Sequence, residues 1–379
     1  MAQDRMVWLD ALRLIAGVSM VGLHASSDAQ GLPYPDAAIT EKIFPLVTRA
    51  FIYTARTELF ILISVFLLLL SLQSRPREYA STITQQVKRL LIPFLFWVAF
   101  YACWNFIKAN AFGYAGSHIE NLTQPVTWAR YLLLGDVKYH MHFLPTLFGI
   151  LLFFPLFKHA VKRPWIGFVI LLTLLCKREA DIYLWSNFKD LSIFPFILRT
   201  VKIVAYIGYG FVAASMLGIY QRKHALSRPV YYLILLIGLV LLTTKLRHTY
   251  LIATSGTWVY MDPFAYWADY LMPIVLFLVA MSASHKHWPD IISRAAPYSF
   301  GIYLCHPIFL DFAEVQFHAS PLGPSAQFLV ECSFAIIATS FFVIAISRIR
   351  SLAWTVGLGP IPTLRLRPFI QRSQEKVHV

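Results

Sequence analysis

Apolar runs of about twenty residues recur along this 379-residue chain, and they constrain its fold more than any other feature. A helix of about 20 residues spans the hydrocarbon core of a bilayer. It also satisfies its own backbone hydrogen bonds there, which an open sheet cannot do. The chain is 58% hydrophobic and 14% charged, whereas soluble domains are about 45–50% apolar and about 25% charged. The sequence therefore predicts an all-α, polytopic integral membrane protein.

Ten apolar runs are long enough to be transmembrane helices, although the fifth is short and ends at Lys177, Arg178 and Glu179. No internal repeat is visible, which argues against a transporter built from two inverted halves. We expect a transmembrane domain over residues 1–350 and a basic cytoplasmic tail over 351–379, with no further domain after the tenth span. The predicted spans are residues 7–27, 50–72, 90–110, 142–160, 164–180, 196–219, 229–246, 264–284, 298–317 and 325–347.

The net charge is +14, but the placement of the cations argues for a membrane rather than for nucleic acid. Lysine and arginine concentrate in the loops after the second, fourth and sixth spans and in the tail, while the loop after the ninth span has neither. The loop after the fifth span is an exception, partly offset by its acidic residues. The positive-inside rule then places both termini in the cytoplasm. Such cations also bind anionic headgroups, so membrane lipids are expected partners.

The longer loops, around residues 28–49, 111–140 and 247–263, then face outward. They carry tryptophans, tyrosines, acids and amides, including Trp128 and Trp258. Aromatic and hydrogen-bonding side chains suit a sugar ligand. The alternative is an ordinary aromatic belt at the membrane interface.

The four cysteines lie in or beside apolar runs and show no Cys-x-x-Cys spacing. A free cysteine in such a place usually packs as a small hydrophobic residue. We therefore expect neither a disulfide framework nor a metal site.

The first apolar run holds an arginine and a histidine, Arg13 and His24, with ten residues between them. Eleven helical steps of about 100° make roughly three turns plus 20°, so both side chains share one face. They differ in depth by roughly 16 Å, about half of the hydrocarbon core. Because ionisable groups at such depth are costly, they usually face a protein interior or a wet cavity. One helix thus presents a cation at one depth and a proton-transfer group at another.

Other polar residues are expected near these two depths. Four histidines and one carboxylate are placed in the outer half of the bundle: His24, Glu58, His140, His142 and His306. Three cations are placed on the inner side: Arg13, Lys88 and Arg89. Such a layout suits a reaction that is split across the membrane, with a phosphate-bearing donor held inside and a neutral imidazole taking a proton outside. A carboxylate such as Glu58 would fix the histidine tautomer.

Structural roles are the alternative for each of these residues. Arg56 and Glu58 can neutralise each other within the second span, and Asp10 can pair with Arg13 three residues away. Lys88 and Arg89 can be interfacial anchors. A lone intramembrane histidine often bonds one helix to another.

Five segments resemble motifs of the membrane acyltransferase-3 family, which O-acylates carbohydrates and other acceptors. WLDALRLIAGVSMVGLHA resembles its opening helix, with Arg13 and His24 on the basic residue and the histidine. TELFILISVFLLLL resembles its acid–x–F-F–x–x–S-G run, with Glu58 on the acid and Ser64 on the serine. Val65 stands where the family usually has glycine, so packing there is expected to differ.

Three later segments continue the resemblance. KRLLIPFLFW is similar to the family's basic-R–x–x–P entry, at Lys88 and Arg89. YHMHFLPTL is similar to its H-L-W-F-L motif, with His140 on the histidine and His142 in place of tryptophan. SFGIYLCHP matches its S–x–G-I-Y-L–x–H-P motif, with Tyr303 and His306 at the tyrosine and the histidine. The resemblance extends over most of the chain and implies the family's multi-span architecture, while the hydrolase-like domain that some members append, which would allow an acyl relay, is not expected.

The resemblance implies a cytoplasmic acyl-CoA donor and an acceptor at the outer face. We hypothesise an O-acetyltransferase of the bacterial inner membrane that uses acetyl-CoA, without a metal, to acylate a polysaccharide or a lipid-linked oligosaccharide. His24 is the expected general base, with Glu58, His140 and His306 orienting it or lining the acyl path. The donor-binding candidates are Arg13, Lys88 and Arg89. The substrate-binding candidates are Ser64, His142 and Tyr303.

Three alternatives remain at the level of sequence. The same fold can use a succinyl-type donor, for which Arg56 is the obvious extra cation. A proton-coupled transporter or flippase of a glycoconjugate would use buried charges differently. A structural subunit of a polysaccharide-synthesis complex, in which His24 would be replaceable, is the third alternative. Within the acyltransferase hypothesis, acylation can proceed directly or through an acyl-histidine.

Overall fold

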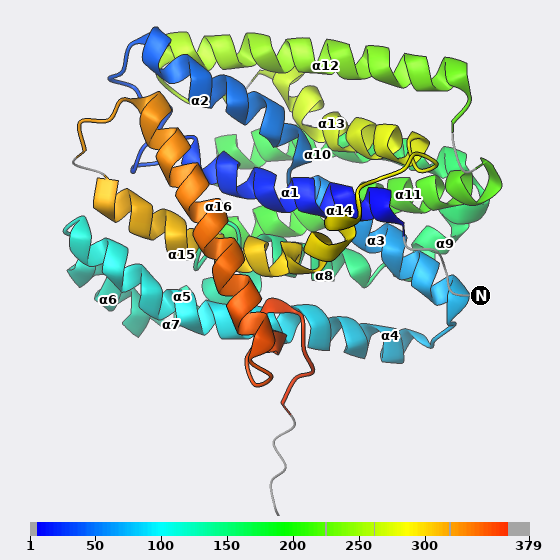
Figure 1. Ribbon diagram of the computed structural model, residues 1–379, viewed down its shortest axis with the longest axis horizontal. Coiled ribbons are helices and arrows are strands. Elements are labelled where there is room, and N and C mark those ends of the chain that lie inside the picture. Colours follow the sequence, from blue (N-terminus) through cyan, green and yellow to red (C-terminus); the bar gives the residue numbers. More distant parts are fainter. Residues whose placement is uncertain (1–5, 224–225, 261, 318–319, 363–379) are drawn as a thin grey trace, which may run out of the picture.

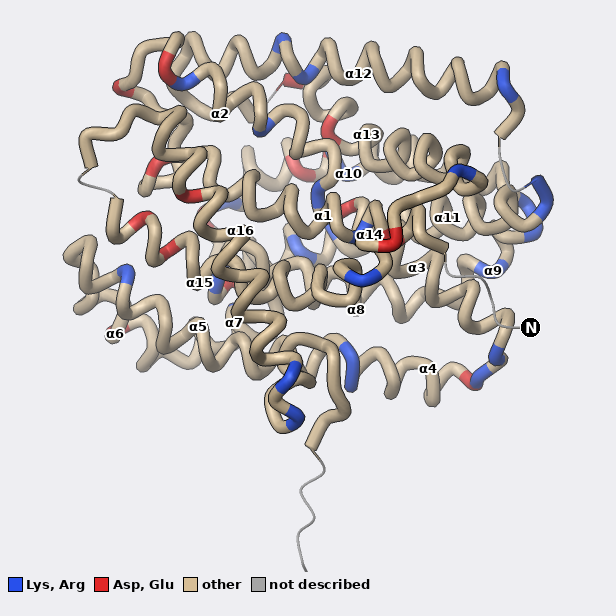
Figure 2. Tube along the Cα trace, viewed as in Figure 1, with Lys and Arg blue, Asp and Glu red and all other residues tan. Residues whose placement is uncertain are grey.

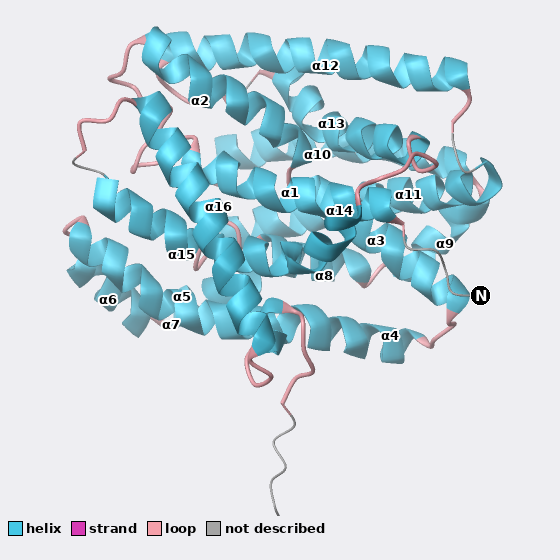
Figure 3. Cartoon of the chain, in the orientation of Figure 1, coloured by secondary structure: helices cyan, strands magenta, loops and turns pink. Residues whose placement is uncertain are grey.

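The computed structural model describes residues 6–223, 226–260, 262–317 and 320–362. Within these ranges the chain consists of helices and connecting loops, without a β-strand (Figure 3), which confirms the predicted all-α class. The α-helices are α1 (Val7–Ala25), α2 (Ile39–Ile52), α3 (Thr57–Ser74), α4 (Tyr79–Gln86), α5 (Ile92–Ala111), α6 (Ala115–Thr123), α7 (Pro125–Leu134), α8 (Phe143–Leu151), α9 (Phe154–Lys162), α10 (Val169–Asn187), α11 (Phe194–Lys223), α12 (Arg228–Ser255), α13 (Pro263–Ser282), α14 (Asp290–Ala295), α15 (Ser299–Phe317) and α16 (Pro324–Arg348). The other helical segments are η1 (Tyr53–Ala55), η2 (Val87–Leu91), η3 (Pro164–Phe168), η4 (Ala296–Tyr298) and η5 (Ala353–Val356).

Seven helical segments among the described residues are long and apolar enough to cross a membrane, or eight if the bent pair α8–α9 is one span. A polytopic membrane protein is thus confirmed, but the predicted number of ten spans is not. A helix lies in every predicted span, and α10 and α15 are the two that fall outside the count. Both carry charged residues, which lower their mean hydropathy.

The first helix lies in the middle of the bundle (Figure 1) and packs against α3, α13, α15 and α16. Most of its residues are buried, from Trp8 to Ala25. At the periphery, α12 is hardly buried and points leucines such as Leu233, Leu236 and Leu239 away from the protein. Large apolar side chains on an outer helix are stable where the surrounding medium is hydrocarbon. The layout therefore places α1 where the protein, and not lipid, surrounds its polar residues.

The second predicted span, 50–72, is two helices rather than one. The helical path breaks at η1, and Arg56 is extended, with φ −77° and ψ −170°. Helix α3 then starts at Thr57, so that Glu58 lies in its first turn, where a negative charge interacts favourably with the helix dipole. The break brings Arg56 and Glu58 into an ion pair, which a continuous helix would not allow between residues two apart.

Proline distorts two other predicted spans. The amide N–H of Ile92 bonds to the carbonyl of Val87, a π-type turn that precedes Pro93 in α5. Since Pro93 has no N–H, it leaves the ordinary bond of this turn unmade, and π-turns of this kind are frequent at functional sites. Helices α8 and α9 meet at a bend of 65°, and Pro155 lies just after it. Like Pro93, Pro155 has no N–H to donate to the preceding turn, which favours a bend there.

The fifth predicted span, 164–180, is longer than expected. Helix α10 continues through Lys177, Arg178 and Glu179 to Asn187 instead of ending at the charged triplet. Lys177 remains within the helix because its ammonium pairs with Asp181 one turn later. Charge alone therefore does not end a helix when a partner lies one turn away.

The beginning of the predicted tail packs onto the bundle. Trp97 of α5 donates a hydrogen bond from Nε1 to the carbonyl oxygen of Thr355, at 2.8 Å. Val356 is fully buried against α15. Residues 363–379, which include most of the predicted basic tail, lie outside the described residues.

Lysine and arginine gather at the end of the molecule where α11 ends and α12 and α4 begin (Figure 2). The opposite end, which holds the start of α2 and the end of α15, carries more aspartate and glutamate (Figure 2). The positive-inside rule uses this asymmetry in charge. It predicts that the end rich in lysine and arginine faces the cytoplasm. The orientation itself stays a prediction.

Close contact between α9 and α11 gives a first testable prediction. A Cβ added at Gly218 would lie 2.1 Å from the carbonyl oxygen of Val161, whereas one at Gly116 would meet nothing within 4 Å. Gly218→Ala should lower stability by about 1–3 kcal/mol, the typical cost of overpacking. Gly116→Ala is the control and should be neutral or slightly stabilising. Thermal unfolding in one detergent measures both, and equal midpoints would contradict the packing of α9 on α11.

Candidate active site

Three histidines from distant parts of the chain meet inside the bundle. His24 comes from the last turn of α1, His140 from the loop between α7 and α8, and His306 from the middle of α15. The rings of His24 and His306 are stacked with centroids 5.6 Å apart, and those of His140 and His306 are 5.1 Å apart. His140 and His306 are completely buried, and His24 is partly buried. The structure thus places three of the four predicted histidines in one cluster.

These imidazoles present buried ring nitrogens without a hydrogen-bond partner among the described residues. The atoms are Nε2 of His24, both ring nitrogens of His140 and Nε2 of His306. His306 bonds through Nδ1 to the carbonyl oxygen of Tyr303, at 2.8 Å. A carbonyl only accepts, so Nδ1 carries the proton and Nε2 presents a lone pair. Buried polar atoms without a partner are rare and often mark chemistry or a missing ligand.

Two tyrosines flank the histidines. The ring of Tyr139 lies 4.0 Å from that of His24, between centroids, and is 40% exposed, so it covers His24 from one side. The hydroxyl of Tyr303 donates a hydrogen bond to the carbonyl oxygen of His140, and the two rings are 5.2 Å apart. In this structure Tyr303, predicted to bind substrate, holds the backbone of the loop that carries His140.

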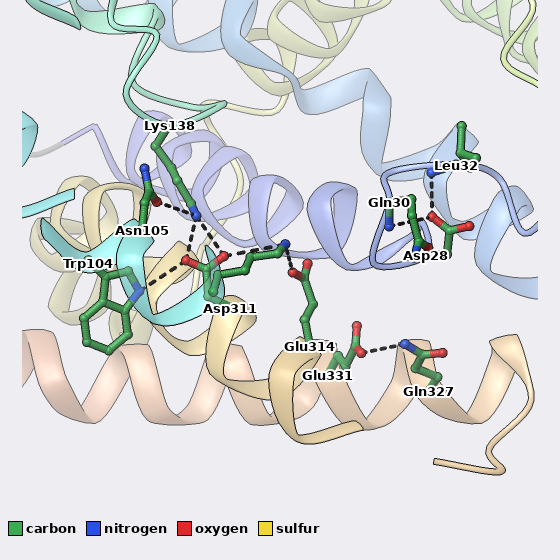
Figure 4. Close-up of polar contacts among 11 residues, drawn as sticks. Asp28, Gln30, Leu32, Trp104, Asn105, Lys138, Asp311, Glu314, Gln327 and Glu331 are labelled. Atoms are coloured by element: carbon green, nitrogen blue, oxygen red, sulfur yellow. Dashed lines mark hydrogen bonds and ion pairs between the residues drawn. The ribbon is translucent and has the colours of Figure 1, made fainter. Parts of the chain in front are cut away.

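An ion pair fixes the same loop to α15. The ammonium of Lys138 donates to both carboxylate oxygens of Asp311, at 2.6 and 2.8 Å (Figure 4). The two side chains are only 8% and 3% exposed. Lys138 also bonds to Asn105 of α5, whose amide in turn donates to the carbonyl of Val137. The loop that carries Tyr139 and His140 is therefore held by charge-assisted bonds to two helices.

The Lys138–Asp311 pair belongs to a larger network (Figure 4). Trp104 donates from Nε1 to Asp311, at 3.2 Å, and Lys108 pairs with Glu314 on the next turn of α15. Two lysines thus face two carboxylates beside the histidine cluster. Buried charges are tolerated when they are paired and hydrogen-bonded in this way.

Burial also sets the protonation state of His140. The apolar surroundings, followed by the neighbouring His306 and His24, lower the pKa of this imidazole well below its usual range. His140 is therefore neutral at pH 7, and a neutral imidazole can accept a proton.

Glu58 lies in a separate cluster. Its carboxylate pairs with Arg56, at 2.7 Å between Nε and Oε2, and accepts hydrogen bonds from Tyr206 of α11 and from Thr57. These partners are not histidines, and they account for its complete burial. The geometry matches the structural alternative, in which Arg56 and Glu58 neutralise each other. The predicted role of Glu58 in orienting a histidine has no hydrogen bond to support it among the described residues.

His142 also lies apart from the three clustered histidines. Its Nδ1 donates to the carbonyl oxygen of Tyr139, at 2.7 Å, and its own carbonyl accepts from Arg199 of α11, also at 2.7 Å. The residue is the N-cap of α8. These bonds give His142 a part in shaping the loop, and its predicted substrate contact stays a prediction.

A cavity of about 230 Å³ opens between α1, α3, η2, α8 and the start of α15. It is lined by Arg13, Arg89 and Ser64, three residues that the sequence assigned to donor or substrate binding. Arg89 and Leu90 of η2 both line the cavity, whereas Lys88 does not. Arg13 also lies 3.8 Å from Asp10, in the local pair that the sequence offered as the alternative. Two guanidinium groups at one cavity fit a phosphate-bearing ligand.

A layer of aromatic rings separates this cavity from the histidines. Phe60 and Phe143 line the cavity, and their rings lie 5.7 and 5.6 Å from that of Tyr303. Tyr303 in turn contacts His140. In the described conformation a ligand in the cavity therefore meets these rings before it meets an imidazole.

The described residues hold no cluster of histidine, cysteine and acidic side chains that could bind a metal ion. The carboxylates nearest to the histidines are already paired with lysines.

Sequence reasoning missed the ion pairs that support the cluster. Lys138 and Asp311 were not singled out, although a charged residue within an apolar span such as Asp311 is itself a signal of function or pairing. Arg49 of α2 was missed as well. It donates to the carbonyl oxygen of Leu23, next to His24, at 2.6 Å.

Comparison with known proteins identifies one family. The family model described as an acyltransferase domain matches residues 6–348, nearly the whole of the described chain. No curated protein and no solved structure matches the chain.

The buried ion pair gives a second testable prediction. Lys138→Met leaves Asp311 without its main partner, so stability should fall by about 3–5 kcal/mol, the usual cost of breaking a buried pair. The double variant Lys138→Met, Asp311→Leu should recover most of this loss, since no charge is then left unpaired. Thermal unfolding of the single and double variants measures the coupling. Additive losses would show that the two side chains do not interact.

Proposed function

Because the chain belongs to the acyltransferase-3 family, we propose that it is an integral-membrane O-acetyltransferase. It moves an acetyl group from cytoplasmic acetyl-CoA to a sugar hydroxyl of a surface polysaccharide or of its lipid-linked precursor, in a bacterial inner membrane. The observation that carries the proposal is the set of buried imidazoles with unpartnered nitrogens. Acyl transfer to a hydroxyl needs such a base, held in a dry site.

The donor occupies the cavity lined by Arg13 and Arg89. Both guanidiniums are always charged and bind phosphate oxygens in a bidentate way, as the phosphates of coenzyme A require. With both termini in the cytoplasm, the Arg13 end of α1 faces the cytoplasm, where acyl-CoA is found. Ser64 and the apolar side chains of α3 and α8 line the remainder of the cavity and suit the thioester arm.

His24 acts as the general base. Its Nε2 takes the proton from the acceptor hydroxyl while the hydroxyl oxygen attacks the thioester carbonyl. The carbon–sulfur bond then breaks, and the imidazolium returns its proton to the leaving thiolate. His306 stacks on His24 and His140 contacts His306, so both hold the base in place and line the acyl path.

The acetyl group reaches His24 past Phe60, Phe143 and Tyr303. Rotation of these rings opens the way from the donor cavity to the histidines, and the closed layer keeps water from the thioester between turnovers.

An acetyl donor is favoured over a dicarboxylic one by the pairing of Arg56. A succinyl group would need an unpaired cation on the acyl path, whereas Arg56 is bound to Glu58 and lies 4.0 Å from Asp269. Turnover of acetyl-CoA and succinyl-CoA by the purified protein decides between the two donors.

The direct and covalent routes differ in one intermediate. Incubation with acetyl-CoA but no acceptor should add one acetyl mass to the intact protein if an acyl-histidine forms. A mass that stays unmodified under conditions of turnover would support direct transfer.

His24 gives a third testable prediction. His24→Ala should lower acetyl transfer by about 10²–10⁴-fold, since a general base contributes about that factor. The matched control is His159→Ala, an exposed histidine on α9. Proton NMR of the polysaccharide from cells with wild-type protein, with each variant and without the protein measures the acetyl signals. Equal acetyl signals with and without the protein would contradict the proposed function in cells that have no second enzyme of this kind.

The donor cavity gives a fourth testable prediction. Arg89→Gln should raise the KM for acetyl-CoA about tenfold, because one charge-assisted bond to phosphate is lost. Lys88→Gln should raise it much less, since Lys88 does not line the cavity. Steady-state kinetics of both variants compare the neighbouring cations directly. A larger effect at Lys88 would contradict the assignment of the cavity.

A further inference from the structure

A second cavity lies between α2, α12 and α13, under the loop that joins α12 to α13. Its volume is about 280 Å³, near the lower end of the roughly 300–1,000 Å³ of small-molecule sites. Its lining includes five aromatic rings: Tyr53, Trp258, Tyr260, Tyr266 and Tyr270. Trp258 is fixed in place, since its Nε1 donates to the carbonyl oxygen of Gly31, at 2.8 Å. Under the predicted orientation this cavity opens toward the outer face.

Most of the charges in this cavity are already neutralised. Lys245 pairs with Asp269. Arg56 is bound to Glu58. Asp262 pairs with Arg247, at 3.1 Å, and caps α13 by accepting from two backbone amides.

Arg49 is the exception among the described residues that line the cavity. Its Nη1 donates only to neutral acceptors, the carbonyl oxygen of Leu23 and the hydroxyl of Ser26, at 2.6 and 3.0 Å. No described carboxylate lies within ion-pair distance of it. The guanidinium lies over the ring of Trp258, 4.4 Å from its centroid. One positive charge on an aromatic wall is therefore left for a ligand.

Arg49 also joins this cavity to the histidine cluster. Its two acceptors, Leu23 and Ser26, flank the turn of α1 that holds His24. His24 itself does not line the cavity. A ligand bound beside Arg49 would therefore lie close to His24 without contacting its imidazole.

We propose that this cavity is an acceptor subsite for an acidic sugar, adjacent in the glycan chain to the sugar that is acylated. Arg49 binds its single negative charge, a uronate carboxylate or a phosphodiester, and Trp258 packs against its ring. This inference rests on the proposed function for the identity of the neighbouring reaction. The binding of the acidic sugar by Arg49 can be measured without that reaction.

The physical reasons are charge and shape. A monoanionic group balances the one unpaired guanidinium without leaving another charge exposed in a partly buried site. Arginine is suited to carboxylate and phosphate because its fork makes two parallel bonds. Aromatic walls with a few placed polar groups are the usual lining of a site for a small ligand.

Isothermal titration of the protein in nanodiscs of zwitterionic lipid tests the subsite. The probes are an oligosaccharide with one glucuronate, its methyl ester and a phosphodiester-bearing oligosaccharide of equal length. We expect the acid or the phosphodiester to bind at least about tenfold more tightly than the ester. The preferred anion identifies the source of the charge. Equal affinity of the wild-type protein for all three probes would overturn the proposal.

Variants assign the charge to its residue. Arg49→Gln should abolish the preference for the anion, and Arg49→Lys should keep part of it. Trp258→Ala should weaken the binding of all probes. The matched control is Arg130→Gln, an exposed arginine of α7 outside the cavity, which should behave as wild type. A preference that persists in folded Arg49→Gln would overturn the proposal. If that variant does not fold, Arg49→Lys and Trp258→Ala decide.

Two further measurements distinguish a failure of the subsite proposal from a failure of the proposed function. Anionic lipid in the nanodiscs should leave the preference intact, and its loss would assign Arg49 to a lipid headgroup instead. Acetyl-CoA binding, measured in the same preparation, tests the proposed function independently. Binding of the acidic sugar through Arg49 without binding of acetyl-CoA would refute the acetyltransferase and keep the subsite. The reverse result would refute the subsite alone.

Discussion

The buried ion pair between Lys138 and Asp311 is the interaction on which the histidine cluster depends. It ties the loop before α8 to α15, and these two segments carry His140 and His306. In an apolar bundle an unpaired charge is so costly that the lysine and the carboxylate must meet. Because this requirement fixes where the loop lies, it also fixes which rings approach His24. The hydrogen bond from Tyr303 to His140 strengthens the same connection.

Three sites follow one another along the bundle. The cavity with Arg13 and Arg89 lies at one end of α1, the histidines lie at the other end, and the cavity with Arg49 begins beside the turn that holds His24. The rings of Phe60, Phe143 and Tyr303 lie between the first cavity and the histidines. The guanidinium of Arg49 lies between the histidines and the second cavity. This order suits the proposed transfer reaction, in which donor and acceptor would approach His24 from opposite directions.

Residue patterns in the sequence predicted some of these neighbours but not others. His24 and His306 lie in apolar segments, where an ionisable residue is itself a signal, and both are found in the cluster. Glu58 gives the same signal, yet its neighbours are Arg56 and Tyr206. The break at η1 turns Arg56 toward Glu58, and no helical periodicity could predict a break that depends on tertiary contacts. Arg89 lines the cavity and Lys88 does not, a difference that depends on how the helices around the cavity pack.

The sequence by itself determined the class of the protein and the residues able to carry a proton or bind phosphate, and it placed a helix in each apolar run without fixing how many cross the membrane. These properties follow from the length of apolar runs, from helical periodicity and from side-chain chemistry, which are local. Only the tertiary structure decided which of these residues meet. Pairing between Lys138 and Asp311, over 173 positions, and between Arg49 and the end of α1 depends on how helices pack. Those contacts set burial, and burial determines which charges are neutralised and which imidazole nitrogens are left without a partner.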